Sequence, residues 1–115
     1  MKKIEIINKV TEINVEVVEL LQKTDDNIEN EFKSFIEKFY SEFGRDSDNF
    51  RSTMSYYHDG KRIEDFISGV NYYMNTMNGS DITYYDAMED LKVMMKLYKL
   101  IKEFLNNYND EIYGK

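Results

Sequence analysis

The sequence predicts an all-α protein, a compact bundle of four to five helices that ends in a long C-terminal helix. The first observation is a run of apolar residues spaced alternately four and three positions apart, which are Ala87, Leu91, Met94, Tyr98, Ile101, Leu105, Tyr108 and Ile112. This spacing places all of these side chains on one stripe of an α-helix over residues 84–112. The second observation is that similar patterns recur over residues 4–23, 27–43 and 62–78, with only short polar segments between them.

The helix expected over residues 4–23 depends on the spacing of Ile6, Val10, Ile13, Val17 and Leu20. Several of these residues are β-branched, which lowers helix propensity, and the alternation within residues 13–17 also suits a strand. The heptad spacing extends over more residues than the alternation does. We therefore expect a helix.

The helix expected over residues 27–43 has a clear start signal and a clear stop signal. Asp26 with Glu29 three residues later matches the capping-box pattern. The buried face is formed by Ile28, Phe32, Phe35, Phe39 and Phe43. Gly44 is expected to end this helix in the left-handed conformation.

Residues 50–67 have two interpretations. Phe50, Met54 and Tyr57 suit a short helix that ends at Asp59-Gly60. The alternative is a β-hairpin, because residues 50–56 also alternate and Asp-Gly is a strong hairpin turn. The helical spacing continues from Ile63 to Met77, so helix is favoured on both sides of Gly60 while the hairpin stays open as an alternative.

Thr83 with Asp86 repeats the capping-box pattern at the start of the long final helix. The same patterns together predict the core of the bundle. Its buried side chains are expected to be Ile13, Val17, Phe32, Phe39, Phe66, Val70, Leu91, Met94, Ile101 and Leu105.

Length and composition limit the function classes. The 115 residues form one domain, 1–115, and contain no cysteine, no signal-peptide pattern and no membrane-spanning apolar run, so a cytoplasmic protein is expected. A net charge of −7 opposes direct binding to nucleic acid or to an anionic membrane. The same charge favours a basic protein as the partner.

No metal or cofactor is expected. Asp46-Ser47-Asp48 could open a calcium loop, but Arg51 and Tyr57 occupy the positions that require glycine and glutamate. His58 is the sole histidine, which is too few for a histidine-based metal site. Pairs of carboxylates near helix ends, including Asp86, Glu89 and Asp90, are explained by capping and solvation.

Arg51 and His58 are separated by six residues and so resemble the R-x(4–6)-H motif of HEPN ribonucleases, which are small all-helical domains. The resemblance implies His58 as general base and Arg51 as the residue that holds the phosphate. It covers only these two residues, and the negative net charge is unfavourable for an RNA-binding enzyme. The protein is therefore predicted to be non-enzymatic, with a HEPN-like ribonuclease as the alternative.

Two stripes of opposite charge flank the apolar patterns of the first and last helices. The acidic stripe consists of Glu5, Glu12, Glu16 and Glu19, and the basic stripe consists of Lys92, Lys96, Lys99 and Lys102. We favour an antiparallel packing of the two helices in which these charges face each other. In the alternative, Glu12, Glu16 and Glu19 stay accessible and bind a basic partner.

Ten tyrosines include three adjacent pairs, Tyr56-Tyr57, Tyr72-Tyr73 and Tyr84-Tyr85. Neighbours on a helix point about 100° apart, so one ring of each pair is expected at the surface. Tyrosine brings a large contact area to protein interfaces. The three pairs are therefore candidates for partner binding, although they could also simply border the core.

The predicted function is a non-enzymatic acidic protein-binding module. Codon usage implied by abundant Ile, Asn, Lys, Tyr and Phe indicates an AT-rich genome. Small size, acidity and paired tyrosines resemble the small inhibitors of nucleic-acid-handling host proteins that phages and mobile elements carry, among them certain anti-CRISPR proteins. An immunity or antitoxin protein is the alternative. A homodimer is also expected, through Leu105, Tyr108 and Ile112.

Overall fold

The computed structural model describes residues 1–24, 26–79 and 81–113, and all regular elements in these ranges are helices. They are α1 (Lys3–Gln22), α2 (Glu29–Phe43), α3 (Asp48–Ser55), α4 (Ile63–Gly79) and α5 (Tyr84–Tyr113), with 3-10 turns at Asp26–Ile28 and His58–Gly60. The predicted all-α bundle with a long last helix is confirmed. The hairpin alternative is wrong, because α3, a 3-10 turn and the start of α4 occupy residues 50–67.

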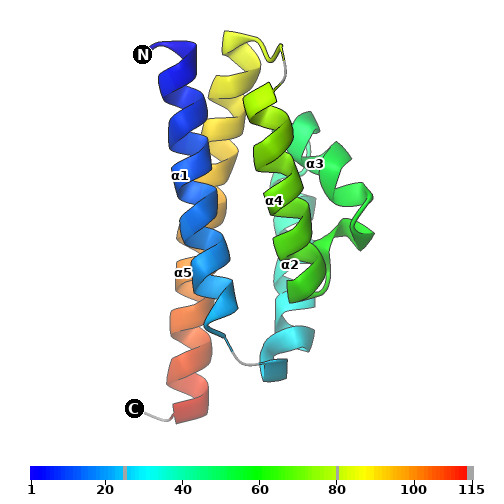
Figure 1. The fold of residues 1–115 in the computed structure, drawn as a ribbon. Helices are drawn as coiled ribbons and strands as arrows, with labels where there is room; N and C mark the ends of the chain where they lie inside the picture. Colours follow the sequence, from blue (N-terminus) through cyan, green and yellow to red (C-terminus); the bar gives the residue numbers. More distant parts are fainter. Residues whose placement is uncertain (25, 80, 114–115) are drawn as a thin grey trace.

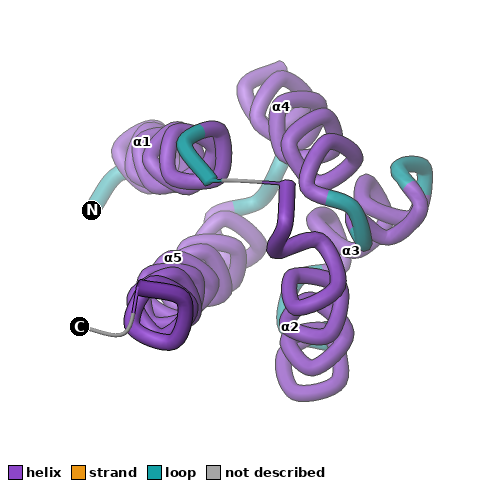
Figure 2. Tube along the Cα trace, turned by 90° about the horizontal axis from the view of Figure 1, so that it is seen from below, coloured by secondary structure: helices purple, strands orange, loops and turns teal. Residues whose placement is uncertain are grey.

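The helices alternate in direction along the chain. In Figure 1, α1 runs downward, α2 upward, the short α3 downward, α4 upward and α5 downward. The first and last helices therefore lie side by side and run parallel, which corrects the antiparallel packing expected from the charge stripes. Viewed along the helices, α1 and α5 occupy one edge of the bundle and α2 and α3 the opposite edge, with α4 between α1 and α3 (Figure 2).

Aromatic rings join α2, α3 and α4 into one core. The ring of Phe66 makes edge contacts with Phe32 at 5.4 Å and with Phe50 at 6.3 Å between centroids. Phe50 in turn meets Tyr73 edge-on at 5.4 Å. Edge-to-face pairs of this kind stabilise a core beyond the area that they bury. The large rings fill the interior of a chain that has a single alanine.

The predicted core is confirmed at nine of its ten positions, and the exception is Ile13, which is half-buried. The buried face of α1 is turned relative to the predicted one. It consists of Ile6, Ile7, Val10, Asn14, Val17, Val18 and Leu21. Asn14 lies at its centre, fully enclosed, with neither side-chain amide atom hydrogen-bonded.

The ends of the helices agree with the sequence signals only in part. The Thr83 hydroxyl accepts a hydrogen bond from the Asp86 amide at 3.1 Å, which confirms the start of α5. At α2, by contrast, Ile28 holds the N-cap position and makes no side-chain capping bond, while the side chain of Asp26, on which the predicted box depends, lies outside the described residues. Gly44 ends α2 with right-handed angles (φ −64°, ψ −18°) instead of the predicted left-handed ones.

Truncation of the α5 stripe should destabilise the whole bundle. Leu91 and Leu105 are 7% and 9% exposed. We expect Leu91→Ala and Leu105→Ala each to lower the free energy of unfolding by about 2–5 kcal/mol, because each leaves a cavity in the core. Urea denaturation followed by circular dichroism measures the loss. Glu103→Ala, at an exposed position on the same helix, is the control, and an equally small effect in all three variants would contradict the assigned stripe.

Candidate functional site

A turn of unusual backbone geometry connects α3 to α4 and lies next to a group of three tyrosines. His58, Asp59 and Gly60 all have positive φ angles, of 55°, 58° and 65°. Such angles are unfavourable for residues with a side chain, so tertiary contacts must hold them in place. The turn folds α3 back onto α4, where Gly69 provides the close approach: a Cβ at that position would lie 2.5 Å from the Met54 sulfur.

The tyrosine cluster consists of Tyr56, Tyr57 and Tyr72. Tyr56 follows the last residue of α3 and is 83% exposed, and Tyr72 on α4 is 51% exposed. The half-buried Tyr57 ring contacts Tyr72 with 6.1 Å between centroids. Exposed rings held on packed helices lose little conformational entropy when a partner covers them. The cluster therefore presents a large aromatic area at the surface.

The remaining tyrosines of the predicted pairs differ among themselves. Tyr73 is buried in the aromatic core, so it cannot contact a partner directly. Tyr84 and Tyr85 are both exposed at the start of α5. The expectation of one surface ring per pair thus fits the first two pairs, with Tyr57 half-buried beside Tyr56, and is wrong for the third.

Charge is distributed unevenly over the bundle. Residues 24–90, which include α2, α3 and α4, contain fifteen acidic and six basic residues. The rest of the chain contains seven acidic and nine basic residues. Nine of those fifteen acidic residues lie within residues 29–79, which span α2, α3 and α4 and carry all six basic residues, and the other six lie in residues 24–28 and 80–90. The acidic excess therefore lies along the chain between the end of α1 and the first turns of α5, a stretch that includes the tyrosine cluster.

The acidic stripe on α1 and the basic stripe on α5 do not pair with each other. Glu5, Glu12, Glu16, Glu19 and the four lysines are all exposed, and no ion pair between α1 and α5 is present among the described residues. The proximity of the Glu16 carboxylate, together with burial, raises the pKa of Tyr98. The ammonium groups of Lys96 and Lys102 lie over aromatic rings, at 4.4 Å from Phe43 and 5.0 Å from Tyr98.

The C-terminal part of α5 exposes less apolar surface than the sequence suggests. Leu105 is packed into the core and Tyr108 is half-buried. The side chain of Ile112 lies outside the described residues. The exposed apolar surface that motivated the predicted homodimer through these three residues is therefore smaller than expected.

Arg51 and His58 do not share a cavity. The Arg51 guanidinium lies 3.9 Å above the Tyr40 ring centre and 3.6 Å from the Asp59 carboxylate. Burial raises the pKa of Tyr40, and the charge of Arg51 opposes that rise. His58 is exposed and lines a cavity of about 600 Å³ that Arg51 does not reach. The arginine is thus engaged by the protein's own side chains.

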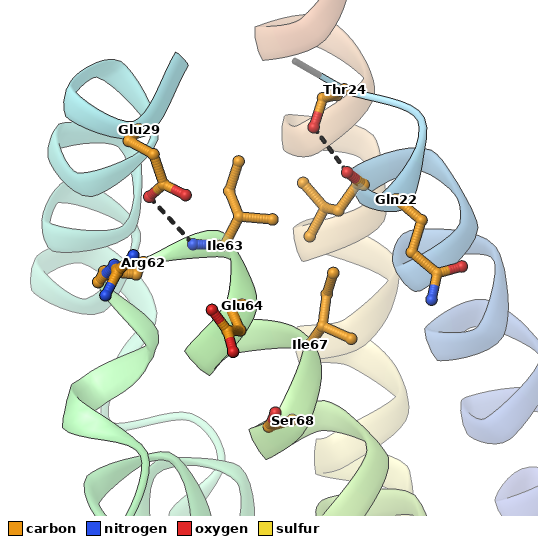
Figure 3. Close-up of a pocket in the computed structure, with 9 residues that line it drawn as sticks. Gln22, Thr24, Glu29, Arg62, Ile63, Glu64, Ile67 and Ser68 are labelled. Carbon is orange, nitrogen blue, oxygen red and sulfur yellow. Dashed lines mark hydrogen bonds between the residues drawn. The ribbon is translucent and has the colours of Figure 1, made fainter. Parts of the chain in front are cut away.

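A second cavity of about 440 Å³ lies between the end of α1 and the starts of α2 and α4 (Figure 3). Glu29 points across it and accepts a hydrogen bond from the Ile63 amide at 3.2 Å, which caps α4. Arg62, Glu64 and Ser68 complete a polar rim. Across the described part of the chain, no three His, Cys, Asp or Glu side chains are grouped to hold a metal ion, and no helix there could span a membrane.

The structure contains a buried polar cluster around Asp90 of α5 that the sequence did not predict. Asp90 was expected to be solvated. Asp90 is 1% exposed. Its carboxylate accepts hydrogen bonds from the Ser47 hydroxyl at 2.7 Å and the Asn49 amide at 3.4 Å. Burial raises the pKa of Asp90, and these hydrogen bonds oppose the rise. Burial, together with the Asp90 charge, also raises the pKa of Tyr73.

Ser47 gives this cluster a structural role. Its hydroxyl oxygen accepts a hydrogen bond from the Phe50 amide at 3.2 Å and so caps α3. The same hydroxyl donates to Asp90, 43 positions later in the chain. The cluster therefore fixes the start of α3 against α5. The buried Tyr73 hydroxyl lies beside this pair without a hydrogen-bond partner among the described residues.

Comparison of the chain with protein-family models, curated proteins and solved structures found no match.

Loss of the Ser47 hydroxyl should weaken the fold. Ser47→Ala removes the α3 cap and leaves the buried Asp90 carboxylate with one fewer donor. We expect a loss of about 1–3 kcal/mol in the free energy of unfolding, measured by urea denaturation. Ser52→Ala, at an exposed position within α3, is the matched control. An effect of Ser47→Ala no larger than that of the control would contradict the tie to α5.

The Asp90 carboxyl should also make stability depend on pH. Because burial raises the pKa of Asp90 above its ordinary 3.8, the folded chain binds this proton more tightly than the unfolded chain. The group therefore stabilises the fold as pH falls toward 3.8 and destabilises it as pH rises through the raised pKa. Asp90→Asn abolishes this titration.

We expect the difference in free energy of unfolding between Asp90→Asn and wild type to move in favour of the variant as pH rises from about 4 to about 7. Urea denaturation at several pH values measures it. Glu103→Gln, an exposed position on the same helix, is the control. A difference that stays constant, or that moves in the opposite direction, would show that Asp90 is not the titrating group.

Proposed function

We propose that the protein is a non-enzymatic binding module that docks on a basic protein surface through the side of the bundle formed by α2, α3 and α4. The observation that carries this proposal is the tyrosine cluster, where Tyr56 and Tyr72 expose large rings within the acidic stretch of the chain. Aromatic anchors surrounded by charge are typical of binding hot spots. Acidic residues around them would steer a cationic partner to the surface.

The acidic stripe on α1 has a different place in this proposal. The sequence grouped Glu12, Glu16 and Glu19 with the tyrosines as one partner-binding set. In the bundle, α1 and α3 lie at opposite edges (Figure 2), so a single flat partner surface cannot cover the stripe and the tyrosine cluster together. The tyrosine cluster therefore carries the proposed partner site, and the α1 stripe requires a separate account.

The more specific form of the proposal is an inhibitor of a nucleic-acid-handling protein, of the kind that phages and mobile elements carry. Grooves that bind nucleic acid are lined by lysine and arginine, because they must neutralise phosphates. An acidic domain with projecting tyrosines would cover such a groove. An immunity or antitoxin protein, which would bind a basic toxin through the same surface, is the second form.

The test is to isolate the partner and then measure its affinity for variants. Pull-down from the source cells identifies the partner, and calorimetry with the purified pair gives the Kd. We expect Tyr56→Ala combined with Tyr72→Ala to weaken binding by at least about tenfold, because each removes a rigid contact ring. Affinity should also fall as salt is added, since the partner is cationic. Tyr84→Ala combined with Tyr85→Ala, a pair exposed elsewhere, is the matched control.

Two results would contradict the proposal. One is a partner whose affinity is insensitive both to salt and to loss of Tyr56 and Tyr72. The other is cleavage of RNA by the purified protein that is lost in Arg51→Ala and in His58→Ala, which would establish the HEPN-like alternative.

A further inference from the structure

The outer face of the α1–α5 pair carries opposite charges on its two helices. Glu12, Glu16 and Glu19 lie on the solvent side of α1, and Lys92, Lys99 and Lys102 lie on the solvent side of α5. Because the helices run parallel and side by side (Figure 1), the two rows also run side by side. Lys9 is the one basic residue between Glu5 and Glu19.

Apolar side chains lie between these rows. On α5, Met95 is 56% exposed and Tyr84 is also exposed, while Met88 and Tyr98 are half-buried. On α1, Ile13 and Leu20 are half-buried, and at about 100° per residue they lie on the same side of Glu12 and Glu19 as Glu16, which acts on Tyr98 of α5. Spacings of three, four and seven residues align these side chains along the helices. The face therefore has apolar side chains between Glu12 and Glu19 on one side and Lys92 and Lys99 on the other, with Lys102 lying over the Tyr98 ring among them.

The two rows match in height. Glu16 lies close enough to Tyr98 to raise the pKa of its hydroxyl, and α1 and α5 run side by side, so residues 16 and 98 lie at about the same level. At a rise of about 1.5 Å per residue, Glu12 lies within about 3 Å of the level of Lys92, and Glu19 within about 3 Å of the level of Lys99. The pairs Glu12/Glu19 and Lys92/Lys99 share a spacing of seven residues. The face is therefore complementary to a second copy of itself.

We propose that two copies of the chain associate through this face, related by a two-fold axis parallel to α1 and α5. That axis places α1 of each copy against α5 of the other, so glutamates meet lysines and Met95 lies near the centre. A two-fold axis perpendicular to the helices and within the interface would instead place glutamates against glutamates. The symmetry of the charges thus selects one arrangement.

The size of the face suits a reversible dimer. A helix of 20 residues is about 30 Å long, and two adjacent helices are about 20 Å wide, which gives roughly 600 Å² from each copy. The total area buried on both copies, about twice that value, lies at the lower end of the range for specific interfaces. This dimer does not depend on the proposed partner. It leaves the tyrosine cluster of each copy on the outside, so the assembly would present two partner sites.

The experiment is light scattering on the full chain and on charge-reversed variants. At about 100 µM, wild type should have twice the 13.8 kDa mass of one chain, and dilution should lower that mass. Glu12→Lys with Glu19→Lys should give a monomer, as should Lys92→Glu with Lys99→Glu. Mixing these two variants in equal amounts should restore a mass of two chains, because every contact is then again between opposite charges.

Glu31→Lys with Glu42→Lys, at exposed positions on α2, changes the net charge equally and should leave the dimer intact. Met95→Lys, which alters the apolar centre, should give a monomer by an independent route. Circular dichroism confirms that each variant is folded. A one-chain mass for wild type or for the mixture, or a two-chain mass for either charge-reversed variant alone, overturns the proposal.

Discussion

The parallel packing of α1 against α5 determines where the remaining helices and charges lie. Adjacent helices in the chain alternate in direction, so two helices pair in parallel only when an odd number of helices separates them. The eight-residue α3 supplies the odd number, because it reverses the chain between α2 and α4. Without that short helix, α1 and α5 would be antiparallel, and the glutamates of one would face the opposite end of the other.

This dependence explains which parts of the fold were predictable. The long apolar stripes of α2, α4 and α5 fix their own buried faces through local spacing, so Phe32, Val70 and Ile101 are buried as predicted. The direction of α1 relative to α5 depends on whether residues 50–57 form a helix, and there the spacing suited a hairpin as well. The relative direction of α1 and α5 was therefore not predictable, although each of the two helices was.

Buried polar groups are the second feature that local sequence patterns did not predict. Asp90 and Asn14 were assigned to the surface or ignored because they are polar, yet both are enclosed. The hydroxyl that compensates Asp90 comes from Ser47, a tertiary contact that no local pattern encodes. The buried face of α1 includes Asn14 and leaves Ile13 half-buried, although neither atom of the Asn14 amide is hydrogen-bonded. The expectation that one tyrosine of each adjacent pair is exposed fits the pairs at residues 56–57 and 72–73. It is wrong for Tyr84 and Tyr85, because both rings are exposed in the first turn of α5.

The close packing of α3 against α4 restricts which residues can replace Met54, Gly60 and Gly69. The Met54 side chain fills the space that a Cβ would need at both Gly60 and Gly69, with its methyl carbon 2.5 Å and 2.8 Å from those ideal positions. The three residues therefore share a single volume. At position 69, where the backbone is helical, an alanine fits only if the end of the Met54 side chain moves or a smaller residue stands at position 54. In related sequences, the residues at positions 54 and 69 should therefore covary, because together they hold α3 and the following turn against α4.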